Sequence, residues 1–161
     1  MKKILVCGTG FGQYYLKAMK NLAKEVKLIG ILSRGSKQSR QWANKLSVPL
    51  YTSLKELDDV DIDIACVVIK SEIVGGLGTE ITKYFLNRGI HVFQEHPMHY
   101  TTYAECIKIA KINNCCYFMN TFYPFLKSVH KFLTIIDEVK KIAQINYIRA
   151  CLLYTSPSPR D

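Results

Sequence analysis

Residues Lys3–Gly12 have the sequence KILVCGTGFG, in which a short apolar run ends at three alternating glycines. The apolar run predicts a buried strand. Apolar side chains at Leu16, Met19 and Leu22 follow at helical spacing and predict a helix directly after the glycines. Glycines suit the tight turn that such a strand-to-helix junction needs. The stretch therefore predicts the first strand and helix of an α/β fold.

The rest of the chain repeats this alternation of strand and helix. Apolar runs predict five further strands, and most of them are continuously apolar, which is typical of strands buried on both faces of a parallel sheet. These runs are Val26–Leu32, Leu50–Tyr51, Asp63–Ile69, Ile90–Gln94 and Cys115–Asn120. Strands that alternate with helices indicate a doubly wound parallel α/β sheet of about six strands, the Rossmann arrangement.

Helix signals lie between the predicted strands. Ser36 is placed to cap a helix that runs to about Leu46, and Gly89 is placed to end a helix near Arg88. The sequence Thr102–Glu105 fits a capping box at the start of the next helix. Pro124 suits the first turn of a further helix.

Three segments follow from this pattern. We predict a nucleotide-binding domain over residues 1–137 and the start of a second, truncated domain over residues 138–150, because Ile142–Arg149 fits one more strand. Residues 151–161 show no helical or strand period and resemble the translation of a sequencing adapter, so we expect a non-native tail. A natural tail rich in proline and serine is the alternative.

Composition narrows the functional classes. The chain has 161 residues, 48% hydrophobic residues and a net charge of +9, which favours one globular domain over disorder. A basic excess fits nucleic acid, an anionic membrane or a phosphorylated ligand, or has no functional meaning. No apolar run is long enough for a signal peptide or a membrane span, and the six cysteines lack a Cys-x-x-Cys pair. We expect a cytoplasmic protein with reduced cysteines and neither a nucleic-acid nor a membrane partner.

The glycine-rich loop is the first candidate binding site. Gly8, Thr9, Gly10, Phe11 and Gly12 lie between a predicted strand and helix, where glycines let the backbone approach a pyrophosphate at the helix N-terminus. The third glycine comes one residue early for the usual dinucleotide motif. A tight turn that binds nothing is the alternative interpretation.

The end of the second predicted strand indicates which dinucleotide would bind. An NAD site needs an acid there for the ribose 2′-hydroxyl, yet no Asp or Glu lies between Glu25 and Glu56. Hydroxyl and guanidinium groups, which can bind a 2′-phosphate, occur instead. They belong to Ser33, Arg34, Ser36 and Arg40. We predict NADPH rather than NADH, with a solvated basic helix face as the alternative.

Polar residues also follow the later strands, at the carboxyl edge where open α/β sheets bind ligands. Lys70 and Ser71 follow the fourth strand and are candidate cofactor residues, although a flexible loop explains them equally well. Glu95 and His96 end the fifth strand, and imidazole can carry a proton near neutral pH. Tyr123 follows the sixth strand and is a second candidate acid or a packing residue. His96 and His99 lack further ligands at metal-binding spacing, so we expect no metal site.

Four motifs in order give the chain a family resemblance. The glycine loop and the Glu-x-Pro at Glu95–Pro97 resemble the Gfo/Idh/MocA oxidoreductases, most of which carry lysine where this chain has His96. The histidine and the further motifs are similar to the thiazolinyl imine reductases of siderophore biosynthesis. These motifs are Val6–Gly12, Gly75–Thr79, Gln94–Pro97 and Asn120–Pro124.

The resemblance implies an activity and partners. It implies reduction of a thiazoline ring to a thiazolidine with NADPH, on an intermediate held by a nonribosomal peptide synthetase carrier domain. His96 and Tyr123 match the group's proposed acids, Glu95 would position the nicotinamide ribose or His96, and the peptide bond before Pro97 is expected to be cis. A second, dimer-forming substrate domain is also implied. The alternatives are a relative that acts on a sugar or other carbonyl, and a module that senses NADP without catalysis.

Overall fold

The structure is a computed structural model that describes residues 1–71, 76–121 and 125–148. The chain divides into two compact units, Met1–Thr121 and the residues from 122 onward. Each unit is described by itself. The predicted nucleotide-binding elements up to the sixth strand all lie in the first unit, whereas the predicted domain boundary at residue 137 stays a prediction.

The first unit is built on a parallel sheet, with six strands among its described residues. The strand order is β3-β2-β1-β4-β5-β6, which is the doubly wound order and confirms the predicted fold class. The chain reverses its winding direction between β1 and β4, so the carboxyl ends of these two strands flank a crevice. The strands are β1 (Lys2–Cys7), β2 (Val26–Leu32), β3 (Leu50–Tyr51), β4 (Ile64–Val67), β5 (His91–Glu95) and β6 (Tyr117–Asn120).

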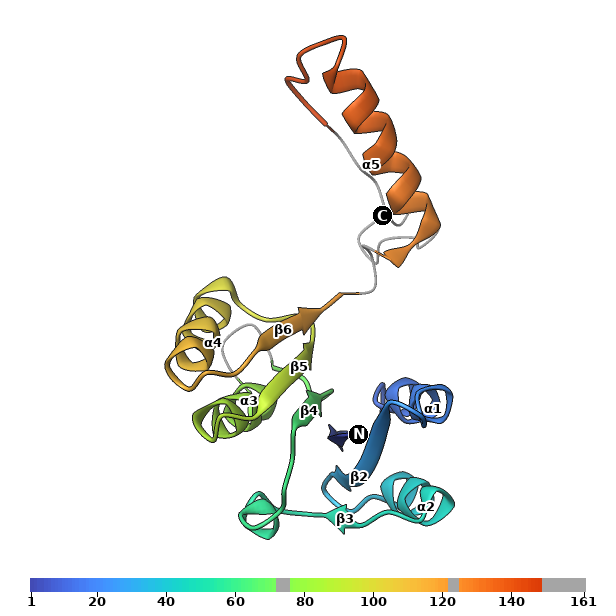
Figure 1. Ribbon diagram of the computed structural model, residues 1–161, viewed down its shortest axis with the longest axis vertical. Coiled ribbons are helices and arrows are strands. Elements are labelled where there is room, and N and C mark those ends of the chain that lie inside the picture. Colours follow the sequence, from blue (N-terminus) through green and yellow to red (C-terminus); the bar gives the residue numbers. More distant parts are fainter. Residues whose placement is uncertain (72–75, 122–124, 149–161) are drawn as a thin grey trace, which may run out of the picture. The chain divides into compact units, whose positions relative to one another are not determined.

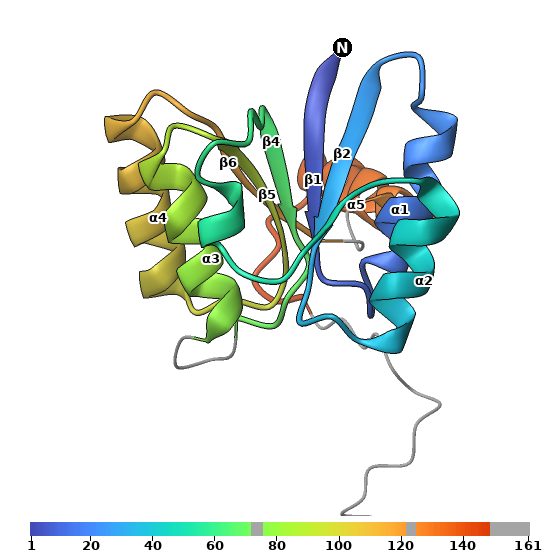
Figure 2. The same ribbon diagram turned by 90° about the horizontal axis from the view of Figure 1, so that it is seen from below.

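Helices cover both faces of this sheet (Figures 1 and 2). The helices α1 (Gln13–Asn21) and α2 (Lys37–Leu46) lie on one face, and α3 (Leu77–Asn87) and α4 (Tyr100–Ile112) lie on the other. A short 3-10 helix, η1 (Lys55–Leu57), precedes β4. Each face has its own apolar core: Leu16 of α1 packs with one side of the sheet, and Phe85 of α3 packs with the other; both are fully buried.

Two of the predicted helix ends are confirmed by the structure, and a third prediction is wrong. The Ser36 side chain accepts the backbone N–H of Ser39 at 3.2 Å, which confirms the predicted cap of α2. Gly89 follows α3 with a φ of 71°, as a helix-ending glycine does. The predicted capping box was wrong, because α4 begins at Tyr100 and the His99 side chain caps it by accepting the backbone N–H of Thr101.

The second unit contains one long helix among its described residues, α5 (Lys127–Lys140). The predicted strand at Ile142–Arg149 is not found: the described part, Ile142–Ile148, has no regular structure after a turn. A strand is stable only when a neighbouring strand takes up its backbone hydrogen bonds, and residues 125–148 contain no strand that could do so. The apolar residues of this segment predict burial, but they do not provide a neighbouring strand. Pro124 lies outside the described residues.

Three cysteines of the first unit are buried packing residues. Cys7, Cys66 and Cys106 are buried and free, and burial raises the pKa of the Cys66 thiol to about 12. Burial also raises the pKa of the Cys7 thiol well above its usual range. These thiols therefore stay protonated at neutral pH and are poor nucleophiles. No helix in the described part of the chain is long and apolar enough to cross a membrane.

Candidate cofactor and active site

The glycine loop between β1 and α1 is closely packed on one side and open on the other. Gly8 has a φ of 93° and its N–H donates to the Leu32 carbonyl at 2.8 Å. A Cβ on Gly8 would lie 2.7 Å from the Val68 carbonyl oxygen, and a Cβ on Gly12 would lie 2.0 Å from the Gly8 carbonyl oxygen. A Cβ on Gly10 would meet nothing within 4 Å. Gly8 and Gly12 are thus required by packing, whereas Gly10 leaves space for a ligand.

A pocket lies between this loop and the end of β2. We call it the β2-side pocket. Seven of its lining residues were predicted from the sequence as cofactor-binding residues: Gly8, Thr9, Gly10, Ser33, Arg34, Ser36 and Lys70. The remaining lining residues are Gln38, Ile69 and Leu77. Arg40 is not among them, because its Nε donates to the Gly35 carbonyl at 2.9 Å and so braces the loop that carries Arg34.

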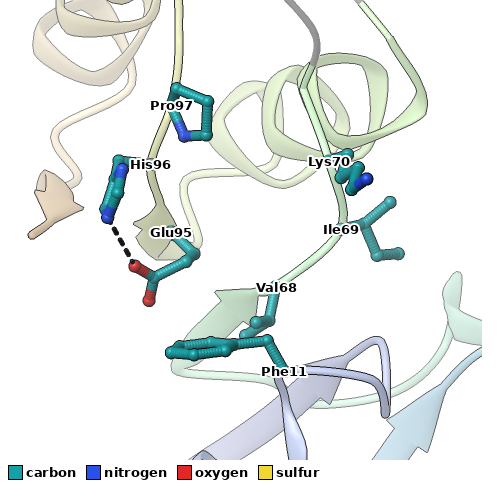
Figure 3. A pocket seen from close by; sticks show the side chains of 7 residues that line it. All are labelled: Phe11, Val68, Ile69, Lys70, Glu95, His96 and Pro97. Carbon is teal, nitrogen blue, oxygen red and sulfur yellow. Dashed lines mark ion pairs between the residues drawn. The ribbon is translucent and has the colours of Figure 1, made fainter. Parts of the chain in front are cut away.

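A second pocket lies at the ends of β4 and β5, and we call it the β5-side pocket (Figure 3). Its lining residues are Phe11, Val68, Ile69, Lys70, Glu95, His96 and Pro97. Phe11, from the glycine loop, lies next to Val68, and Glu95 points toward His96 (Figure 3). Ile69 and Lys70 line both pockets, so the two form neighbouring parts of one groove along the sheet edge.

Glu95 and His96 are the chemically reactive pair of the β5-side pocket. The His96 Nε2 lies 3.6 Å from the Glu95 Oε1, and the side chains are 36% and 12% exposed. The backbone N–H of His96 donates to the Asn120 carbonyl at 3.2 Å, which fixes the turn after β5 to the end of β6. The peptide bond between His96 and Pro97 is cis, as the resemblance implied. The nearly buried carboxylate of Glu95 and the partly exposed imidazole of His96 therefore lie side by side in the groove.

Two residues that the sequence analysis did not assign to the site hold the other oxygen of Glu95. The Tyr15 hydroxyl donates to the Glu95 Oε2, and the Asn120 Nδ2 donates to the same oxygen at 3.0 Å and to the Tyr15 hydroxyl oxygen at 2.7 Å. Tyr15 comes from α1, Glu95 from β5 and Asn120 from β6. One signal was available: Tyr15 precedes Met19 by four residues, which places it on the sheet-facing side of the helix.

A separate buried network lies beneath the groove. Gln94 is fully buried; its Oε1 accepts from the Thr82 hydroxyl at 2.9 Å and from the Tyr117 hydroxyl at 2.8 Å, and its Nε2 donates to the Ser71 hydroxyl. Ser71 is only 2% exposed. The structure therefore places Ser71 under the groove and not on its wall. Its predicted cofactor contact stays a prediction. The candidate acid Tyr123 lies outside the described residues.

The groove fits a dinucleotide in one orientation. A pyrophosphate belongs at the glycine loop, where Gly10 leaves open space and α1 begins. The adenosine half of a dinucleotide lies over the second strand of such a sheet, which is the β2-side pocket with Arg34. The nicotinamide half would then lie in the β5-side pocket, beside Glu95 and His96. The residues present thus fit the nucleotide that the glycine loop predicted.

Comparisons with solved structures show the same fold. A myo-inositol 2-dehydrogenase from Lactobacillus plantarum matches with a TM-score of 0.74 and 24% identity over 86% of this chain. A 3-ketoreductase from Actinomadura kijaniata in complex with NADP matches with a TM-score of 0.70 and 17% identity over 85% of this chain. A scyllo-inositol dehydrogenase from Lactobacillus casei with bound NAD(H) matches with a TM-score of 0.71 and 21% identity over 87% of this chain.

The chain spans well under half of these proteins: 42%, 44% and 42% of their lengths, respectively. A comparison with curated protein sequences found no match. A family model described as an oxidoreductase family with an NAD-binding Rossmann fold matches residues 2–121, which is the whole of the first unit apart from Met1. The crevice, the glycine loop and the family match agree, and the chain belongs to the Gfo/Idh/MocA oxidoreductase family.

Proposed function

We propose that the full-length protein reduces a thiazoline C=N bond to a thiazolidine with NADPH, on an intermediate that a nonribosomal peptide synthetase carrier domain presents during siderophore biosynthesis. The observation that carries the proposal is the Glu95–His96 pair in the β5-side pocket, with an imidazole at the position where most of the family has lysine. We further propose a cytoplasmic enzyme with a second, substrate-binding domain that forms a homodimer.

The residues of the β5-side pocket suit this chemistry. When bound, NADPH supplies a hydride, which the carbon of the C=N bond accepts. The nitrogen then needs a proton, and His96 is about one third exposed on the pocket wall, where it can reach a substrate. Tyr123 is the second candidate donor. Glu95 lies behind His96 and holds the imidazole in place. A positioned acid of this kind accelerates such a step by about 10²–10⁴-fold.

A second candidate function is a dehydrogenase or reductase that acts on a sugar or other carbonyl. The solved structures favour it, because those named above are two inositol dehydrogenases and a 3-ketoreductase. Their sequence identities to this chain are below 25%, so they support the shared fold but do not identify the substrate. A non-catalytic module that senses NADP is the remaining alternative.

One experiment separates the three functions. The full-length protein is incubated with NADPH deuterated at the transferred position and either a carrier-bound thiazoline or a panel of keto sugars. We expect deuterium at the reduced ring carbon of a thiazolidine, detected by mass spectrometry. Deuterium in a sugar alcohol alone would establish the second function instead. Tight NADPH binding without transfer to either substrate would establish the sensing module.

The cofactor preference gives a separate prediction. Arg34 is exposed on the wall of the β2-side pocket, where a 2′-phosphate would lie. Replacing it by aspartate puts a repelling carboxylate in that position, so Arg34→Asp is expected to weaken NADPH binding by about tenfold or more and to leave NADH binding nearly unchanged. Calorimetric titration of both cofactors measures the ratio.

A matched control makes the same change of charge away from the pocket. Lys24 is exposed in the turn before β2, at the opposite end of that strand from Arg34. Lys24→Asp is expected to alter both affinities equally and by less than twofold, through long-range electrostatics alone. If Arg34→Asp behaves as Lys24→Asp does, Arg34 does not select the 2′-phosphate.

A further inference from the structure

Glu95 has two carboxylate oxygens with different surroundings. Tyr15 and Asn120 both donate to Oε2, whereas Oε1 faces His96 in the β5-side pocket. Two hydrogen bonds from different elements to one oxygen of a carboxylate fix the rotation of the whole group. The side chain is 12% exposed, so solvent competes little with these contacts.

Tyr15 itself is held in place and keeps its proton. Its ring lies 6.0 Å from the ring of Phe93 in an edge-on arrangement, and the Asn120 amide donates to its hydroxyl oxygen at 2.7 Å. Burial, together with the hydrogen bond to Glu95, raises the pKa of the Tyr15 hydroxyl far above its usual range. The hydroxyl therefore keeps its proton near neutral pH and remains a donor to Glu95.

We propose that Tyr15 and Asn120 are positioning residues of the nicotinamide half of the site: they hold one oxygen of Glu95 so that the other stays directed at His96 and the bound cofactor. The inference rests on the proposed function in that it assigns the nicotinamide half of NADPH to the β5-side pocket. Tyr15 does not itself line the β5-side pocket and acts through Glu95, which does.

The position of Tyr15 gives its hydrogen bond to Glu95 a second role. Tyr15 lies on α1, the helix whose N-terminus follows the glycine loop, and Glu95 ends β5 on the far side of β4 from that loop. The Tyr15–Glu95 hydrogen bond therefore ties the pyrophosphate-binding helix to the nicotinamide end of the groove. Movement of α1 relative to β5 would break it, so this contact adds to the strand pairing that holds the two halves of the groove together.

The test compares Tyr15→Phe with Tyr14→Phe. Phenylalanine keeps the ring of Tyr15 against Phe93 and removes only the hydroxyl. Tyr14 is the preceding residue of the same helix, and its side chain is exposed, so Tyr14→Phe is the matched control. Each variant is titrated by calorimetry with NADPH and with 2′,5′-ADP, which carries the 2′-phosphate but lacks the nicotinamide half.

We expect Tyr15→Phe to weaken NADPH binding by about five- to tenfold, because a charge-assisted hydrogen bond that orders the nicotinamide end is lost. Its affinity for 2′,5′-ADP should change by less than about twofold, and Tyr14→Phe should change neither. In a Glu95→Gln background, the charged acceptor is gone. Tyr15→Phe should then change the binding free energy of NADPH by less than half as much as it does in the wild-type protein. Unchanged NADPH affinity, or equal weakening of both ligands, would overturn the proposal.

A ligand-free measurement keeps this inference separate from the proposed function. With ¹³C-labelled glutamate, the carboxyl carbon of Glu95 should change its chemical shift in Tyr15→Phe and not in Tyr14→Phe. An unchanged Glu95 signal refutes the positioning role even if NADPH binds. If the wild-type protein binds neither ligand, the proposed function fails, and the spectrum still decides whether Tyr15 holds Glu95.

Discussion

Replacing Gly12 by alanine is expected to lower the free energy of unfolding by about 3 kcal/mol, the upper range for overpacking a tight site. The added Cβ would lie 2.0 Å from the Gly8 carbonyl oxygen and 2.9 Å from its carbonyl carbon, so backbone must move. No flexible side chain can give way there. Because Gly8 packs against Val68, the displacement would pass to the end of β4 and open the groove. Urea unfolding followed by circular dichroism measures the change.

Gly10→Ala is the matched control, with the same substitution two residues away in the same loop. A Cβ on Gly10 meets nothing within 4 Å, so the free energy of unfolding should change by less than about 0.5 kcal/mol. Gly10 lines the β2-side pocket, however, and its Cβ would stand where the pyrophosphate approaches the backbone. We therefore expect NADPH binding to weaken by about tenfold. Equal stability of both variants would contradict the packing argument, and unchanged NADPH binding by Gly10→Ala would contradict the close approach.

The sheet was predictable from the sequence because its central strands, β1 and β4, are largely buried on both faces. Runs such as Ile4–Cys7 and Ile64–Val67 are continuously apolar, and their alternation with helices leaves few topologies other than the doubly wound one. The same reasoning failed at Ile142–Ile148. An apolar run reports a tendency to be buried, and a strand also needs a partner that the sequence pattern does not identify.

The candidate site could be predicted only in part, because a sequence pattern does not record which distant residues contact one another. Glu95 is the last residue of β5, His96 directly follows it and Arg34 lies two residues after β2; strand ends meet at one sheet edge, so their placement followed from topology. The network around Glu95 joins Tyr15 to a residue 80 positions away, which no local pattern records. Similarly, Ser71 follows a strand and fits the rule, yet Gln94 holds its hydroxyl beneath the groove.

Under the proposed function, His96→Ala in the full-length protein is expected to slow hydride transfer to a thiazoline by about 100-fold or more, while NADPH binding changes by less than about threefold. The imidazole, 36% exposed on the wall of the β5-side pocket, is the proposed proton donor, and alanine removes it. We expect the cofactor to be held mainly at the glycine loop and the β2-side pocket, which His96 does not line. Single-turnover kinetics with saturating NADPH measure the transfer step alone.

Two further variants decide whether the loss reflects the proton or the shape of the side chain. His96→Lys restores a protonated donor of the kind that most of the family carries, and it is expected to recover about tenfold of the rate lost in His96→Ala. His96→Gln restores hydrogen bonding without an acid and should recover little. His130, exposed on α5, provides the matched control, and His130→Ala should transfer hydride at the wild-type rate. If His96→Gln recovers as much as His96→Lys, His96 orients the substrate and the proton comes from another group, for which Tyr123 is the remaining candidate.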